Sequence, residues 1–351
     1  MKIKPDFTRL KKVLYRDGEP DILPLFEYLI DPEIIQAITG KPANAESITE
    51  SYLKLGYDYV PATTNFQYEF LTNATNDTAN LSKGERIFLN DNNGIIENRH
   101  NFNSYNWPVI DNSVAYNILQ IEKYLPEGMK MIIDLAPGGI LECVMWLMGY
   151  IPFSYALYED EQLVWDMFER ITDDLMKVLK LSLEIPDIDN IGAVMLGDDM
   201  GFSHSTMIAP EMLRKFVFPC QKRVADLIHS YDLPMILHSC GNLDEVMDDL
   251  IDYVGIDAKH SFEDKIMPVT EAKMKYGNRV ALLGGVDMNF ICTSNEEEIR
   301  KYVDNIIEKC AAHGGFALGT GNSVANYVPL ENFFAMIDEC RMKGTYPMRR
   351  T

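Results

Sequence analysis

The chain has 351 residues, with 53 Asp and Glu against 32 Lys and Arg, which gives a formal net charge of -21. A chain with this negative charge repels phosphate backbones and anionic lipid heads. We therefore expect no nucleic-acid partner and no membrane partner. A small molecule, or a protein with a complementary surface, is the ligand to expect.

Apolar runs alternate with helical patterns along the chain. A turn-rich segment at 16–21 leads into ILPLFEY, which ends near Glu27 and is the first candidate strand. Apolar runs bounded by turn residues predict eight strands, at 22–28, 56–62, 131–139, 191–199, 233–240, 255–261, 279–287 and 314–321. Amphipathic patterns with start and stop signals predict the intervening helices, at 31–40, 45–55, a stretch ending at Tyr150, 161–185, 210–228 with a break at Pro219, 242–253, 295–312 and 329–343.

The segment 63–113 differs from the rest, because it is rich in Asn, Asp and Thr. Its short alternating pieces ERIFL and GIIENR lie on either side of the turn signal DNNG, which predicts a β-hairpin inserted after the second strand. Such an insertion either covers a pocket or decorates the surface.

Eight strand-and-helix units predict one α/β domain over residues 1–351, a (β/α)8 TIM barrel with this hairpin insertion. A doubly wound open sheet is the alternative, since periodicity does not establish closure. The six cysteines form no C-x-x-C pair, the first residues carry no apolar signal segment, and no apolar run approaches the ~20 residues that cross a bilayer. We therefore expect a cytoplasmic location.

The run LPMILHSCGN at 233–242 ends with His238 and Cys240 two residues apart. Alternate residues of a strand share one face, so both side chains can hold one metal ion, as in half of a zinc site. A packed core histidine and a buried thiol are the other interpretation. Asn242 and Glu245 have the spacing of a helix N-terminal cap.

In a barrel, polar residues at the strand ends gather on one face, where active sites form. We expect Asp198, Asp199, His238 and Asn322 to be catalytic. Asp198 and Asp199 suit acid-base chemistry or substrate binding, but adjacent acids after a strand also cap helices. The residues that we expect to bind substrate, on these strand ends or on nearby loops, are Glu27, Thr63, His204, Asp287, Ser323 and Trp107. Other polar strand-end residues are Thr64, Asp134 and His260.

Six ordered stretches resemble the uroporphyrinogen decarboxylase-like superfamily, whose other large branch is the cobalamin-dependent methyltransferases. They are GDDMG at 197–201, IAPEMLRKFVFP at 208–219, LHSCGN at 237–242, YGNRVALLGGVD at 276–287, GGFALGTGNSV at 314–324 and VPLENFFAMI at 328–337. The resemblance implies a (β/α)8 barrel and favours a metal at His238 and Cys240.

The two branches differ in the residues that they require. The decarboxylases carry an Arg-rich loop after strand one and an Asp after strand two, whereas this chain reads FEYLIDPEII and PATTNF there. The carboxylate of Glu27 at that place would repel the acidic side chains of a porphyrinogen. The methyltransferases bind zinc with H-x-C on strand five and a Cys after strand eight, where this chain has Asn322. We expect Glu27 to replace that ligand, with Asp287 as the other carboxylate to examine.

The resemblance implies a methyltransferase that moves a methyl group between a small molecule and a separate corrinoid protein. Zinc would be its metal, and methylcobalamin would arrive on the partner, because the cobalamin-binding motif D-x-H-x-x-G does not occur in the sequence. The alternatives are a metal-free decarboxylase that uses Asp198, His238 and Asn322, and a binding protein for a methylated amine. The aromatic cage of the binding protein would consist of Tyr68, Trp107 and Tyr327.

Overall fold

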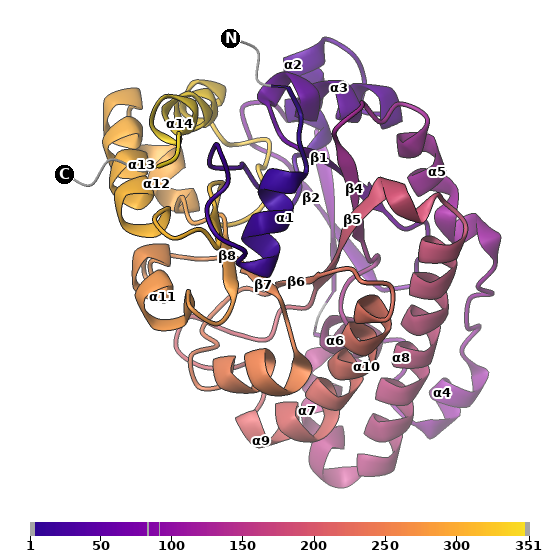
Figure 1. Ribbon diagram of the computed structural model, residues 1–351. Helices are drawn as coiled ribbons and strands as arrows, with labels where there is room; N and C mark the ends of the chain where they lie inside the picture. Colours follow the sequence, from indigo (N-terminus) through magenta and orange to yellow (C-terminus); the bar gives the residue numbers. More distant parts are fainter. Residues whose placement is uncertain (1–3, 83, 91, 348–351) are drawn as a thin grey trace.

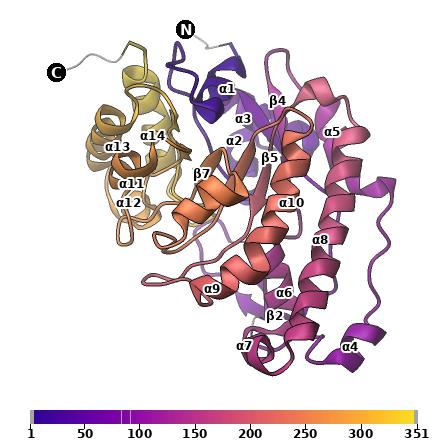
Figure 2. The same cartoon turned by 60° about the horizontal axis from the view of Figure 1, so that its bottom comes forward.

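Seven parallel strands form the central sheet of the computed structural model, which describes residues 4–82, 84–90 and 92–347. The sheet has the order β1-β4-β5-β6-β7-β8-β9, and every neighbouring pair is parallel. The strands are β1 Tyr59–Thr63, β4 Lys130–Asp134, β5 Ile191–Gly197, β6 Met235–His238, β7 Ala258–His260, β8 Ala281–Leu283 and β9 Phe316–Ala317. The sheet curls and the helices lie around it, so the architecture is TIM-barrel-like (Figures 1 and 2).

Helices connect the strands in the alternating order that the sequence predicts. The α-helices are α1 Thr8–Tyr15, α2 Pro32–Thr39, α3 Ala45–Leu55, α4 Arg99–Ser104, α5 Tyr116–Glu122, α6 Ile140–Met148, α7 Tyr150–Glu159, α8 Glu161–Glu184, α9 Pro210–Met212, α10 Phe218–His229, α11 Val269–Tyr276, α12 Met288–Thr293, α13 Glu296–Cys310 and α14 Leu330–Lys343. The shorter elements are the 3-10 helices η1 Asn112–Ala115 and η2 Ile188–Asn190, and the π-helical η3 Leu213–Val217 and η4 Asp249–Val254.

Two of the expected helices differ in detail from the prediction. The helix expected at 210–228 is divided into α9, η3 and α10, because Pro219 has no N–H to continue the α-helical ladder. The helix expected at 242–253 is only the π-helical η4. Asn242 does not cap it, because its side chain accepts a hydrogen bond from the Asp244 N–H at 3.0 Å and closes a turn instead.

The first predicted strand is not a regular strand. It forms isolated parallel bridges, from Leu25 to Leu318 and from Ile30 to Val324. Pro24 has no N–H to donate. The hydroxyl of Tyr59 in β1 accepts from the Glu27 N–H at 2.8 Å and donates to the Glu27 carbonyl at 2.6 Å. A side chain therefore supplies the bonds that a backbone ladder between this segment and β1 would otherwise provide.

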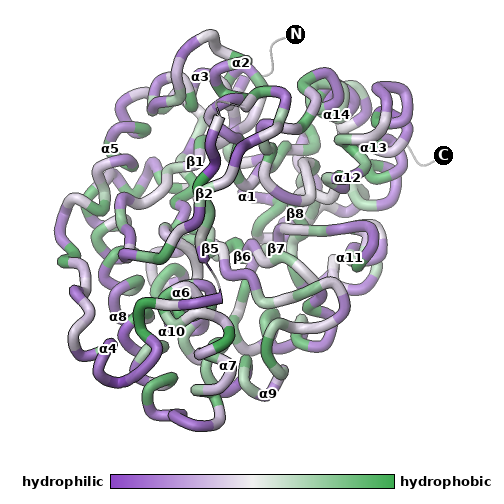
Figure 3. The backbone as a smooth tube through the Cα atoms, turned by 180° about the vertical axis from the view of Figure 1, so that it is seen from behind, coloured by the Kyte–Doolittle hydropathy of each residue, from purple (hydrophilic) through white to green (hydrophobic). Residues whose placement is uncertain are grey.

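A two-stranded antiparallel sheet follows β1, formed by β2 Thr72–Asn76 and β3 Glu85–Leu89. The expected partner of ERIFL is wrong, because β3 pairs with the preceding TNATN instead of with 94–99; Asp91 of the expected turn is outside the described residues. Asn326 of the β9 loop donates to Asp77 at 2.7 Å. Arg86 of β3 lies 3.6 Å from Asp31. These contacts fix the pair beside the ends of the sheet strands. Its strand β2 is hydrophilic in Figure 3, whereas β3 exposes Ile87 and Phe88.

The central strands are buried on both faces, as a parallel sheet covered by helices requires. All seven residues of β5 are buried, which agrees with the near-continuous apolar run in its sequence. In the described part of the chain, no single helix is long and apolar enough to cross a membrane. Among the described helices, α6 and α7 reach that length and hydropathy only when taken together, and they form a pair bent by 99°.

Candidate metal centre and active site

His238, Cys240 and Asp199 converge at the carboxyl ends of β5 and β6. Gly197 of β5 is in register with His238 of β6 in the parallel ladder. The two residues that follow Gly197 therefore emerge beside the two residues that follow His238. The Cys240 Sγ is 3.5 Å from the His238 Nε2, and the Asp199 Oδ1 is 3.8 Å from the same nitrogen. The Cys240 N–H also donates to Asp199 at 2.7 Å. One ligand atom from each residue therefore lies within 4.8 Å of the others.

This geometry suits a tetrahedral zinc ion. Zn–S bonds of about 2.3 Å and Zn–N bonds of about 2.05 Å at a tetrahedral angle separate sulfur from nitrogen by about 3.5 Å, and Zn–O bonds of about 2.1 Å separate nitrogen from oxygen by about 3.4 Å. The observed separations of 3.5 and 3.8 Å need little adjustment to reach these values. Three protein ligands leave a fourth position for substrate, as catalytic zinc sites do.

The electrostatics of the three side chains also favour a cation. Burial, assisted by the charge of Asp199, raises the pKa of Cys240 to about 12, so its sulfur is a thiol at neutral pH without a cation beside it. Burial lowers the pKa of His238, which keeps the imidazole neutral and able to ligate. Two donors already face the sulfur. The Asn322 Nδ2 lies at 3.3 Å and the Ser261 Oγ at 3.4 Å, and both stabilise a thiolate.

Three residues missed by the sequence analysis, or mentioned there without a role, complete the surroundings of His238. The Tyr28 ring stacks on the imidazole with centroids 3.9 Å apart and planes at 14°. His260 places its Nδ1 2.7 Å from the Nδ1 of His238. Ser261 directs its hydroxyl at the Cys240 sulfur. The available signal was position, since Tyr28 follows Glu27 at the end of a predicted strand and Ser261 follows His260.

Glu27, the ligand that we expected to replace the family cysteine, is not part of this cluster. It is fully buried, and its two oxygens contact Thr320, which donates its N–H at 3.0 Å and shares a short hydrogen bond through its hydroxyl. Burial raises the pKa of Glu27 to about 8. Adjacent residues of an extended segment point to opposite sides, so Tyr28 reaches His238 and Glu27 points away. Asp199 supplies the carboxylate instead.

Asp198 and Asp287 accept hydrogen bonds from backbone N–H groups, and Asp287 also lines the cavity of about 700 Å³ described below. Asp198 is fully buried and accepts from the N–H groups of Leu141 and Glu142 at the start of α6, at 3.3 and 3.1 Å, and from the Gln221 side chain at 2.7 Å. Burial raises the pKa of Asp198 to about 6. Asp287 caps α12 and accepts a further N–H from Asp264. Of the two interpretations of Asp198, helix capping is the closer, but the helix is α6, which precedes Asp198 in the chain, and not the next helix, which we expected.

The remaining predicted residues are dispersed. Thr63 donates to Asp134 at 3.2 Å and lines a separate cavity of about 610 Å³ between α3 and α5. His204 is exposed on the loop after β5. Trp107 packs edge-on against Tyr68 at 6.1 Å, and the Arg170 guanidinium lies 4.5 Å over its ring. The face of the Trp107 ring is therefore already covered by a cation of the protein itself. Tyr327 lines another cavity, so the expected aromatic cage of Tyr68, Trp107 and Tyr327 is not assembled.

A cavity of about 700 Å³ is lined by Asn322 and Ser323 of the β9 loop. It lies next to the cluster, because Asn322 also contacts the Cys240 sulfur. Arg86 from the antiparallel pair and Lys265 from the β7 loop contribute positive charge to its lining. The acids in its lining are Asp31, Glu263 and Asp287. Its volume is that of a site for a drug-sized ligand, and its mixture of charges suits a small polar or zwitterionic molecule better than a polyanion.

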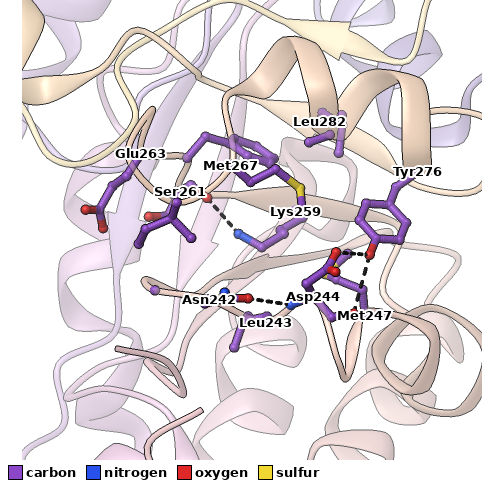
Figure 4. Close-up of a pocket in the computed structure, with 14 residues that line it drawn as sticks. Asn242, Leu243, Asp244, Met247, Lys259, Ser261, Glu263, Met267, Tyr276 and Leu282 are labelled. Atoms are coloured by element: carbon purple, nitrogen blue, oxygen red, sulfur yellow. Dashed lines mark hydrogen bonds between the residues drawn. The ribbon is translucent and has the colours of Figure 1, made fainter. Parts of the chain in front are cut away.

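A smaller cavity of about 30 Å³ lies behind Ser261, between the β6 and β7 loops (Figure 4). Lys259 is buried there, and burial lowers the pKa of its ammonium to about 8. Its Nζ donates to the Ser261 carbonyl at 2.7 Å and to the carbonyls of Ser239 and His260 at 3.2 Å. The lysine thus ties together the strand ends that carry Cys240 and His260.

Fold and site together define a TIM-barrel-like α/β protein with a His, Cys and Asp cluster at the carboxyl ends of its central strands. The family model described as uroporphyrinogen decarboxylase (URO-D) matches residues 141–342, more than half of the chain, so the chain belongs to this family. No curated protein matches the sequence.

Two solved structures share the fold. A methyltransferase from Methanosarcina mazei superposes with a TM-score of 0.70 at 17% identity, over 97% of this chain and 99% of that one. A putative vitamin-B12 independent methionine synthase from Listeria monocytogenes has a TM-score of 0.52 at 11% identity, over 92% of this chain and 98% of that one. At these identities the likeness establishes the common fold.

Proposed function

We propose that this protein is a zinc-dependent methyltransferase that moves a methyl group between a small molecule and the corrinoid of a separate corrinoid protein. The observation that supports it best is the cluster of Asp199, His238 and Cys240, with separations close to those of a tetrahedral zinc site, at the end of the barrel-like sheet where active sites form. The shared fold with a methyltransferase agrees with this proposal.

Zinc held by these side chains would act as a Lewis acid toward the sulfur or oxygen atom that gives or receives the methyl group. Cys240 and Asp199 contribute two negative charges, which balance a divalent cation. Asn322 takes the place of the third family ligand and donates to the Cys240 sulfur. This hydrogen bond withdraws electron density from the thiolate. Because Asn322 donates to the sulfur and does not ligate the metal itself, the fourth position stays free for substrate.

The cavity of about 700 Å³ is the proposed substrate site, because Asn322 belongs both to its lining and to the contacts of Cys240. Arg86 from β3 lines it, so the antiparallel pair shapes the entrance. Methylcobalamin on the partner protein would approach from the same side, since the strand ends are the open face of the fold. A small methylated compound, thiol or phenol would occupy the cavity.

Decarboxylation without metal is the second candidate, and the family model favours it by its description. Glu27 does not repel a substrate, because its carboxyl is buried and faces Thr320. The charges that line the cavity weigh against a porphyrinogen. Its two cationic side chains are accompanied by three acids, which is a poor match for the several carboxylates of a porphyrinogen.

The test is the zinc content of protein purified without added metal or chelator, compared between the parent, Cys240→Ala and Glu27→Gln. We expect about one zinc per chain in the parent and in Glu27→Gln, and little in Cys240→Ala. Methyl transfer between methylcobalamin and thiol or phenolic acceptors should then be lost in Cys240→Ala. Carbon dioxide release from a carboxylated substrate by metal-free protein would support the decarboxylase instead.

A further inference from the structure

Four residues from four segments form a continuous hydrogen-bonded chain that ends at the proposed metal site. Glu27 contacts Thr320 through both of its oxygens. The Thr320 carbonyl lies 3.1 Å from the Nε2 of His260, and the His260 Nδ1 lies 2.7 Å from the Nδ1 of His238. The imidazole of His238 then points its Nε2 toward Cys240 and Asp199. Glu27, Thr320 and His260 are fully buried, and His238 is nearly so.

The chemistry of the groups decides where each proton lies. The Thr320 carbonyl can only accept, so the His260 Nε2 carries the proton and donates it. A neutral imidazole with its proton on Nε2 has a lone pair on Nδ1. The His238 Nδ1, at 2.7 Å, must therefore be the protonated donor of the next bond. Consequently the His238 Nε2 has a lone pair directed at the sulfur of Cys240 and the carboxylate of Asp199.

We propose that His260 is a positioning residue that fixes the tautomer and the ring orientation of His238, so that the Nε2 lone pair is ready to ligate a metal before the metal arrives. The proposal deepens the zinc site proposed above. Metal-binding histidines generally donate their second nitrogen to a carboxylate, a carbonyl or water. Here a neutral imidazole takes this place, at the centre of a chain anchored in the Thr320 backbone.

A neutral partner suits this site for an electrostatic reason. Cys240 and Asp199 already bring two negative charges to a buried cluster when zinc is bound. A carboxylate at the place of His260 would add a third charge that one divalent cation does not balance, at a high desolvation cost. The His260 imidazole orients His238 without adding charge. The Tyr28 ring stacks on the His238 ring at 3.9 Å and limits the rotation of His238.

The first experiment is performed on the parent protein without metal, with 15N-labelled histidine. Long-range 15N–1H correlation spectra show which ring nitrogen of each of the six histidines carries a proton. We expect His238 to be protonated on Nδ1 alone and His260 on Nε2 alone. A His238 ring protonated on Nε2, or on both nitrogens, would overturn the proposal whether or not the protein binds zinc.

The second experiment measures zinc affinity by chelator competition in three variants whose folding is checked by circular dichroism and Tm. His260→Phe removes the acceptor and should weaken binding by about 10- to 100-fold. His260→Asn retains an acceptor near the Nδ1 position and should restore most of the affinity. His229→Phe, on the surface of α10, is the control and should bind as the parent does.

The two proposals fail in different ways. A parent that binds no zinc contradicts the metal site, while the tautomers of His238 and His260 in the same protein still decide the role of His260. A folded His260→Phe variant with the zinc affinity of the parent contradicts the role of His260 and leaves the metal site intact. Weaker binding in His260→Phe with recovery in His260→Asn supports both.

Discussion

Replacing Glu27 by Gln should stabilise the protein at alkaline pH and leave zinc binding unchanged. The Thr320 hydroxyl has one hydrogen and two acceptor neighbours, the Glu27 carboxyl and the Asn322 carbonyl at 2.5 Å, so a protonated Glu27 would supply the hydrogen that the second contact needs. This agrees with a pKa raised by burial from 4.5 to about 8. The side-chain amide introduced by Glu27→Gln would make the same two contacts, accepting from the Thr320 N–H and donating to its hydroxyl.

The magnitude follows from linkage. The pKa of Glu27 is higher in the folded state than in the unfolded state, so its contribution to stability is complete below pH 4.5 and is lost as the pH rises toward 8. At about 1.4 kcal/mol for each pKa unit, the parent loses on the order of 4 kcal/mol over this interval through this one group. The neutral Gln side chain does not titrate, so Glu27→Gln should not show this loss.

Urea unfolding of the parent and Glu27→Gln at a series of pH values from 5 to about 8.5 measures the difference directly. Other buried acids, such as Asp58 and Asp134 with pKa values raised to about 6, titrate in both proteins and cancel in the comparison. Glu211→Gln, at an exposed position, is the control. A difference between parent and Glu27→Gln that stays constant with pH would refute the protonated state of Glu27, and loss of zinc in Glu27→Gln would restore it as a ligand.

Four further substitutions test the site and its support. Asp199→Asn should lower zinc affinity by at least about 10-fold in a chelator titration, whereas Asp198→Asn should keep the zinc and lose roughly 1–2 kcal/mol of unfolding free energy. Gly319→Ala places a Cβ 1.6 Å from the Phe26 carbonyl oxygen, so we expect a loss of about 3 kcal/mol or more in urea unfolding. Asn322→Cys restores the family pattern and should tighten zinc binding by about 10-fold or more. An unchanged affinity would place Asn322 outside ligand distance.

Periodicity and motif text were sufficient to predict most of the architecture. Apolar runs between turn residues located seven of the eight expected strands, because a parallel sheet buried on both faces leaves a continuous apolar signature. The first segment was the exception. Its apolar run is real, but Pro24 has no N–H to donate to a ladder, and the Tyr59 hydroxyl takes the backbone bonds of Glu27.

The sequence also determined half of the candidate metal centre, since the spacing of His238 and Cys240 places both on one side of one strand end. It did not determine the carboxylate. Asp199 reaches the cluster because β5 lies beside β6 with Gly197 in register with His238. The tertiary structure decides which strands pair and in which register. Glu27 lies one residue from Tyr28, which does reach His238. In extended chain one residue reverses the side-chain direction, so only the three-dimensional structure could assign one to the site and the other to Thr320.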